Sequence, residues 1–314
     1  MIDLSVIIPL TGGSEAFERT LLSVLENRPA NCEIIVPHPG PYDDPYRLAD
    51  EVTFSQLPAD AEIAQLLNRG VDMANGRIVH VLQCGAEVTE GWAAAAMERF
   101  ADSSIAAVAP LIVQEGGRRI VSAGVCYGAG GTRRVAHAGR KRAPTVKQNR
   151  RLRRTRIDGP SLTAGFYRRD LLLALQGFDT SVGTEFADVD LARSLQTVGY
   201  AAALEPDCVV VGGDEAHTRI DSFTRGRNAQ RLFWRHIQAA GLTKSMLLHV
   251  FSVLLTFLRF LPGSLPALAG RLIASCELRS YRQHHAMLDA HATQKAIIPL
   301  PDSADSTTPS RRAA

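Results

Sequence analysis

The sequence predicts an α/β fold with a mostly parallel central sheet and a helical C-terminal extension. Continuous apolar, β-branched runs alternate with segments of helical period, which is typical of βαβ units. Strands buried on both faces are uninterrupted apolar runs of this kind, as in LSVII at 4–8. The chain has 314 residues, 46% of them hydrophobic and 21% charged, so it can bury a large core.

The predicted elements of the sheet region follow from these changes of period. Strands are predicted at 4–8, 32–36, 52–57, 77–83, 105–113, 121–127 and 208–211, and helices at 15–27, 61–74 and 91–101. Ligands of such sheets bind beyond the carboxyl ends of the strands. The loops at 9–14, 37–44 and 83–91 are therefore the predicted binding region.

The stretch 165–199 combines a Gly-Phe-Asp turn with two acids that open a predicted helix. Apolar residues recur after Asp188 and Asp190 at helical spacing, and Gly199 stands where a C′ glycine ends a helix. This pattern places both acids in the first turn. They either stabilise the positive end of the helix dipole, or one of them is a general base at a cleft.

Cysteine usage and the N-terminus indicate a cytoplasmic protein. The five cysteines are widely scattered, with no CxxC pair, which favours reduced thiols over a disulfide framework or a zinc site. The chain begins with a strand-like run and has no basic segment before it, which is unlike a signal peptide.

A basic stretch interrupts the α/β pattern. Residues 133–156 hold eleven Lys or Arg and no acid, and we expect a loop or a partly disordered segment there. It could be a solvated loop, or bind an anionic donor or acceptor, an anionic membrane surface, or nucleic acid. No aromatic residue lies between Tyr127 and Phe166, so single-stranded nucleic acid would find no stacking platform and is the least favoured partner.

The chain from residue 223 onward is predicted to be helical. Its most apolar segment, 247–261, reaches only about 22 Å as a helix, against roughly 30 Å of membrane hydrocarbon. It is predicted to be a docked core helix or an interfacial helix lying on a bilayer. We therefore divide the chain into a domain at 1–222, with the basic loop 133–157 inside it, a helical extension at 223–297 and a disordered tail at 298–314.

Four motifs in order resemble glycosyltransferase family 2, the inverting transferases with the GT-A fold. They are LSVIIPLTGG, CEIIVPHPGPYDD, LLNRGVDMANGRIVHVLQCGAEVTEGW, and the segment from SLTAGFYRRD to LEPDCVVV. The resemblance covers about residues 3–240 and implies transfer of a sugar from a nucleotide-sugar donor to a glycan or a lipid-linked hydroxyl acceptor, with inversion. A lipid-linked acceptor would place the protein at the cytoplasmic face of a membrane.

On the acceptor side the family pattern is mostly kept. The resemblance implies that Asp188 is the general base, with Gly165 and Asp190 also on this side. Asp190 is expected to cap or bond within the first helical turn. Asp188→Asn is expected to abolish transfer and leave the melting temperature nearly unchanged.

On the donor side the resemblance implies that Pro9, Thr11, Gly12, Gly40 and Asn68 contact the nucleotide. The chain departs from the family here, since His38 and Pro39 replace the nucleoside-contacting aspartates. Gly85 replaces the metal aspartate, and Ala187 the glutamate before Asp188.

These departures leave the use of a metal open. Glu87 is the one carboxylate near Gly85 that could hold Mg²⁺ or Mn²⁺. Alternatively, cationic side chains at 118–119, 133–134 or 140–156 stabilise the diphosphate without a metal. A third hypothesis is a catalytically inactive GT-A-like domain that binds a glycan or an anionic partner.

Overall fold

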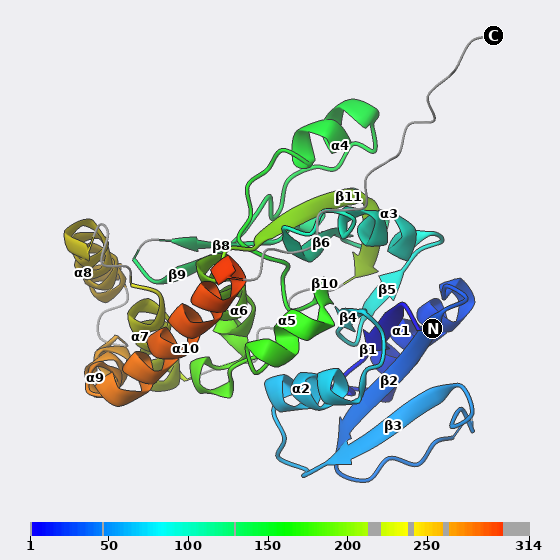
Figure 1. The fold of residues 1–314 in the computed structure, drawn as a ribbon, viewed down its shortest axis with the longest axis horizontal. Helices are drawn as coiled ribbons and strands as arrows, with labels where there is room; N and C mark the ends of the chain where they lie inside the picture. Colours follow the sequence, from blue (N-terminus) through cyan, green and yellow to red (C-terminus); the bar gives the residue numbers. More distant parts are fainter. Residues whose placement is uncertain are drawn as a thin grey trace.

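A computed structural model describes residues 2–45, 47–128, 130–212, 221–237, 242–259 and 264–297. The predicted disordered tail, 298–314, lies outside the described residues. Within these ranges the chain forms an α/β fold, in which a mixed, mostly parallel sheet has helices on both faces (Figure 1). The predicted fold class is confirmed.

The central sheet has the strand order β3-β2-β1-β4-β10-β6-β11-β5, and β7 pairs with β6. Strands β1 to β4 are mutually parallel, as are β6 and β11, whereas β10 is antiparallel to both β4 and β6. The strands are β1 (Leu4–Ile7), β2 (Cys32–Pro39), β3 (Val52–Leu57), β4 (Ile78–Leu82), β5 (Ala86–Val88), β6 (Ile105–Val113), β7 (Ile120–Ser122), β10 (Ala164–Arg168) and β11 (Ala201–Gly212). A separate hairpin joins β8 (Val125–Gly128) to β9 (Thr132–Val135).

Both faces of the sheet are buried, which explains the continuous apolar runs. Val6 and its sheet neighbours pack on one face with α1 and α3, whereas Ile7 packs on the other with α2, α5 and α6. The helices of this region are α1 (Ser14–Asn27), α2 (Ile63–Met73), α3 (Trp92–Arg99), α4 (Val146–Leu152), α5 (Arg169–Ala174) and α6 (Thr184–Thr197), with a 3₁₀ turn η1 (Thr180–Val182).

The C-terminal helices gather at the end of the molecule opposite β1 to β3 (Figure 1). They are α7 (Ser222–His236), α8 (Leu242–Arg259), α9 (Leu265–Ser275) and α10 (Leu278–Ile297). Helices α7 and α9 pack closely because Gly226 and Gly270 have no side chain at the crossing. A Cβ at either glycine would lie 2.1 Å from a backbone oxygen of the other helix.

Most of the predicted elements are present, and the differences concern short or polar elements. Strand β11 begins seven residues before the predicted 208–211 strand, and the predicted strand at 121–127 is divided between β7 and β8. Strand β10 was not predicted, because AGFYR lacks the β-branched residues that mark the other strands. The basic stretch forms β9 and α4 in place of the expected loop.

Candidate active site

Helix α6 carries both candidate acids, and they lie one turn further from its N-terminus than predicted. The helix begins at Thr184, because Gly183 at φ 72 forms the N-cap and TEF continues the helical backbone. Glu185 is the acid of the first turn. The expectation that Asp188 and Asp190 lie in the first turn, with Asp190 capping it, is therefore wrong.

The Asp188 carboxylate is buried, with 1% of the residue exposed, and is fully engaged by hydrogen-bond donors. Arg133 of β9 donates from Nε to Oδ1 at 2.9 Å and from Nη2 to Oδ2 at 2.6 Å. The backbone N–H of Val189 donates to Oδ1 at 2.7 Å, and that of Leu162 donates to Oδ2 at 3.1 Å. These donors from β9, α6 and the Leu162 backbone hold the carboxylate in one orientation.

Asp188 is linked through the Leu162 N–H to the carboxyl end of β4, next to the loops predicted to bind the donor. Next to its partner Leu162, Thr163 accepts a backbone hydrogen bond from Gln83 at the end of β4, at 2.9 Å. The Cys84 thiol donates in turn to the Pro9 carbonyl beyond β1, at 3.1 Å. A continuous chain of contacts therefore connects the candidate base with the loops after β4 and β1.

The predicted nucleotide residues at the carboxyl ends of the strands cluster in part. Beyond β1, Pro9 is buried, and Gly12 adopts φ 97 with open space beside it. Thr11 lies between them, and its hydroxyl is 3.5 Å from the Pro9 carbonyl. Gly40 directly follows β2, and its N–H donates to the Leu57 carbonyl on β3 at 2.9 Å. The loop after β1 has no charged side chain up to Gly13, whereas the loop after β2 carries Asp43 and Asp44.

The residues around Gly85 do not fit a divalent metal. Gly85 adopts φ 87, which favours glycine, and its N–H donates to Thr20 Oγ1 at 2.8 Å. The side chain of Glu87 is 37% exposed and lies 3.8 Å from Arg19 Nε. Within the described ranges, no group of three or more His, Cys, Asp or Glu side chains could hold a metal ion. One carboxylate beside an arginine is a poor donor set for Mg²⁺ or Mn²⁺.

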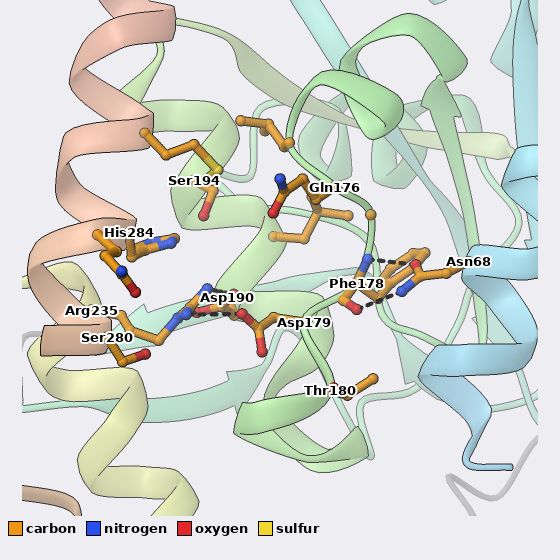
Figure 2. A pocket seen from close by; sticks show the side chains of 15 residues that line it. Asn68, Gln176, Phe178, Asp179, Thr180, Asp190, Ser194, Arg235, Ser280 and His284 are labelled. Carbon is orange, nitrogen blue, oxygen red and sulfur yellow. Dashed lines mark hydrogen bonds and ion pairs between the residues drawn. The ribbon is translucent and has the colours of Figure 1, made fainter. Parts of the chain in front are cut away.

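Asn68, predicted to contact the nucleotide, instead braces the Gly-Phe-Asp turn. Its Nδ2 donates to the Phe178 carbonyl at 2.9 Å, and its Oδ1 accepts from the Phe178 N–H at 2.8 Å (Figure 2). Both polar atoms of the amide are thus engaged by one residue 110 positions away. The Asn68 amide therefore has a structural role in this turn.

Gly165, predicted on the acceptor side, lies within β10 at the centre of the sheet. Its carbonyl is 3.2 Å from Nδ1 of buried His80, and a Cβ at this position would come within 2.6 Å of Pro160. Close packing explains this glycine.

Asp190 is engaged with α7, away from Asp188. Arg235 donates from Nε and Nη2 to the two carboxylate oxygens, at 2.7 and 3.0 Å, and His236 Nε2 lies 2.8 Å from Oδ1. Burial alone would raise the pKa of Asp190, but the charge of Arg235 and the contact with His236 hold it well below its ordinary value. Asp190 therefore joins α6 to the C-terminal helices.

A polar cavity of about 510 Å³ adjoins this junction, between the Gly-Phe-Asp turn and α10 (Figure 2). Arg235 points into it between Asp190 and Asp179, and its Nη1 lies 2.9 Å from Asp179 Oδ2. His284 of α10 lines the opposite side, and burial lowers its pKa to about 3. The charges in this cavity compensate one another, which indicates a structural role.

No family model matches the chain, and no curated protein sequence matches it significantly. Solved structures do. One is GalNAc-T7 with UDP, GalNAc and Mn²⁺, at a TM-score of 0.55 and 17% identity, covering 74% of this chain and 47% of that chain. The chain thus spans about half the length of that protein. Another is the mannosyltransferase PcManGT from Pyrobaculum calidifontis with GDP-Man and Mn²⁺, at a TM-score of 0.51 and 18% identity, covering 94% of this chain and 86% of that chain.

The chain has the GT-A fold. Within this fold, the sequence did not indicate the partners of the two acids. Arg133 was predicted only as one of several cations that could stabilise a diphosphate, and no sequence motif marked Arg235 or His236 as partners of Asp190. Both ion pairs join segments more than forty positions apart, so only the folded chain reveals them.

Proposed function

We propose that this GT-A chain transfers a sugar from a nucleotide-sugar donor to a hydroxyl acceptor, with inversion. The observation that carries the proposal is the position of Asp188, whose contacts connect it with the loops after β4 and β1. Of the two similar structures, GalNAc-T7 holds UDP and GalNAc, and the mannosyltransferase PcManGT holds GDP-Man.

Asp188 is the proposed general base. In the transfer step its carboxylate takes the proton of the acceptor hydroxyl, the hydroxyl oxygen attacks the anomeric carbon, and the nucleoside diphosphate leaves. In this structure the Arg133 guanidinium is hydrogen-bonded to both oxygens of that carboxylate. We infer that an acceptor displaces the β8–β9 hairpin, which carries Arg133, when it binds.

The leaving diphosphate is proposed to be stabilised without a metal. Helix α1 begins after Gly13 with no side-chain cap, so its first N–H groups are available to an anion at the Thr11–Gly13 loop. This is consistent with the poor donor set around Gly85 and Glu87.

A thermal-shift screen tests the donor site. UDP, GDP, CMP and dTDP, each with and without their sugars, are added in Mn²⁺ and in EDTA, because a ligand of the folded state raises the melting temperature. Stabilisation by one nucleotide in EDTA is expected. A shift that requires Mn²⁺ would assign Glu87 as a ligand and contradict the metal-free mechanism.

The second candidate is a catalytically inactive GT-A domain that binds a glycan or an anionic partner. The engagement of Asp188 by Arg133 and the glycine at the metal position favour it. The absence of a shift with every nucleotide, together with no sugar transfer to any acceptor tested, would support this candidate over the transferase.

Helix α8 supports a further part of the proposal, peripheral contact with a membrane. Its polar face docks on the protein, where His249 Nδ1 donates to the Gly130 carbonyl at 2.7 Å and His249 Nε2 lies 2.8 Å from Gln230 Oε1. The opposite face exposes an apolar stripe at helical spacing, namely Leu247 (68%), Phe251 (57%), Leu254 (50%) and Leu258 (61%). Among the described residues, no helix is long and apolar enough to cross a membrane.

Segment 247–261 was predicted to be either a docked helix or an interfacial helix on a bilayer. Helix α8 has features of both, since one face is docked on the protein and the other exposes apolar side chains. We propose that the stripe inserts into the interface of a bilayer that holds a lipid-linked acceptor. Co-sedimentation with anionic vesicles is expected, and Phe251→Ser with Leu258→Ser should weaken it. Equal sedimentation of this variant and the parent chain would exclude α8 as the contact.

A further inference from the structure

The basic stretch is held in a defined conformation by its backbone. Segment 139–142 runs beside β7, where Gly139 N–H donates to the Ile120 carbonyl and Ile120 N–H donates to Arg140, both at 2.9 Å. Arg142 N–H donates to Arg118, also at 2.9 Å. The cations of this segment are therefore fixed along one edge of the sheet.

Helix α4 is anchored both to β11 and to the preceding segment, where Gln148 accepts from the Ala143 N–H at 2.6 Å and donates to the Lys141 carbonyl at 3.2 Å. Leu152 is buried in the cluster beneath it, and Asn149 donates to Asp207 of β11 at 2.5 Å. Arg153 contacts Glu205 at 2.7 Å and also Asp207. These contacts orient the helix, which lies beyond β11 (Figure 1), and they use the two β11 acids to neutralise Arg153.

Residues of α4 and of the segment before it line a cavity of about 980 Å³. Six cations line it, namely Arg140, Lys141, Lys147, Arg150, Arg151 and Arg154. No carboxylate lines the cavity, and in the described part of the chain none of the six has an ion pair. Six like charges around one concave space create a strong positive potential.

The lining selects the chemistry of the anion. Arginine forks bind phosphate oxygens in pairs, and lysine adds a point charge. The apolar residues of the lining are Ile120, Ala143 and Leu152, half as many as the cations. His137 is the one ring in the lining, where its Nε2 lies 3.0 Å from Thr155 Oγ1, and no Phe, Tyr or Trp side chain offers a larger platform on which a base could stack.

We propose that this cavity binds a ligand that carries two or more neighbouring phosphate groups. Its volume suits a small phosphorylated molecule or a phosphorylated headgroup. The site is separate from the proposed donor loops and does not depend on sugar transfer.

Calorimetric titration of the full chain with inorganic tripolyphosphate tests the proposal. A saturable one-to-one complex is expected, and Arg150→Gln with Arg154→Gln should weaken it at least tenfold. Both arginines are exposed, so the variant should keep its fold. The matched control, Arg279→Gln with Arg282→Gln, removes the same charge from exposed positions of α10 and should bind as the parent does.

A second pair, Arg140→Gln with Lys141→Gln, lies outside α4 and so guards against a local effect on that helix. It should also weaken binding at least tenfold. The absence of saturable binding, or equal losses in the α4 and α10 pairs, would overturn the proposal. So would duplex RNA that binds more tightly than tripolyphosphate through the same arginines.

Binding to vesicles distinguishes a phosphorylated lipid headgroup from a soluble phosphorylated ligand. Binding to vesicles with a phosphoinositide bisphosphate, and not to phosphatidylserine vesicles of equal charge, would identify a lipid headgroup. Binding of free tripolyphosphate alone would identify a soluble ligand. In the nucleotide screen above, a nucleotide at the donor loops should stabilise the Arg150/Arg154 variant as much as the parent, so failure at one site is distinguishable from failure at the other.

Discussion

The guanidinium of Arg133 lies against the carboxylate of Asp188, with Nη2 2.6 Å from Oδ2 and Nε 2.9 Å from Oδ1. Arg133 comes from the β8–β9 hairpin and Asp188 from α6, so the pair attaches the hairpin to the helix that carries the candidate base. The pair thus couples the stability of this region to the availability of the base.

Asp188→Asn is therefore expected to destabilise the fold, in contrast to the expectation from sequence. The asparagine amide leaves the largely buried Arg133 charge without its counterion. This should lower the free energy of unfolding by roughly 3–5 kcal/mol. Urea denaturation measures this loss. Asp188→Asn with Arg133→Gln should recover a good part of it, because neither charge then remains unpaired.

Activity of the same variants separates a base from a merely structural acid. If Asp188 is the base, the double variant stays inactive while its stability recovers. Transfer activity that returns with stability in the double variant would rule Asp188 out as the base.

Arg235→Gln should also destabilise the protein strongly, by roughly 3–5 kcal/mol, because it leaves the buried Asp190 carboxylate without its main counterion. Asp179→Asn is the matched control, since Asp179 is about one-third exposed and contacts the same guanidinium. Its effect should be much smaller, within about 1 kcal/mol. Similar losses in both variants, measured by urea denaturation, would contradict the assignment of Asp190 as the main partner.

Asn68 and Gly177 should act on stability as one unit. Asn68→Ala leaves the N–H and carbonyl of Phe178 without their partner, at about 1–3 kcal/mol. Gly177→Ala places a Cβ 2.2 Å from Asn68 Oδ1 at φ 73, so it is strained as well. A double-mutant cycle should give less than the sum of the two effects, whereas simple additivity would mean that the two residues do not share this turn.

Stability should fall with decreasing pH below about 6.5, because buried His80 resists protonation. Burial lowers the pKa of His80 to about 3, although the Gly165 carbonyl opposes the shift. Between these two pH values the unfolded chain binds a proton that the folded chain excludes, so the free energy of unfolding rises with pH and levels off above 6.5.

His80→Phe tests this dependence, since its ring can keep the stack on Phe166. The slope between pH 4 and 6 should decrease by about 1.4 kcal/mol per pH unit relative to the parent. An unchanged slope would show that His80 is already protonated in the folded chain. His236, His249 and His284, whose pKa values burial also lowers, remain in both proteins and contribute to the residual slope.

The sequence by itself determined the fold class and most of the buried strands. Runs such as LSVII and IAAVAPLIV must be covered on both faces, and the glycine and proline turns between them leave few other arrangements. It also located the loops at the carboxyl ends of β1, β2 and β4, because the direction of parallel strands follows from their order.

The tertiary structure alone decided what the polar residues do. Asn68 faces a turn 110 positions away, Asp188 meets Arg133, and Asp190 meets Arg235, because each pair joins segments that only folding brings together. Periodicity within a segment records which side of an element is buried. It carries no record of the charged partner that will lie opposite, and so the chemistry of the site required the folded chain.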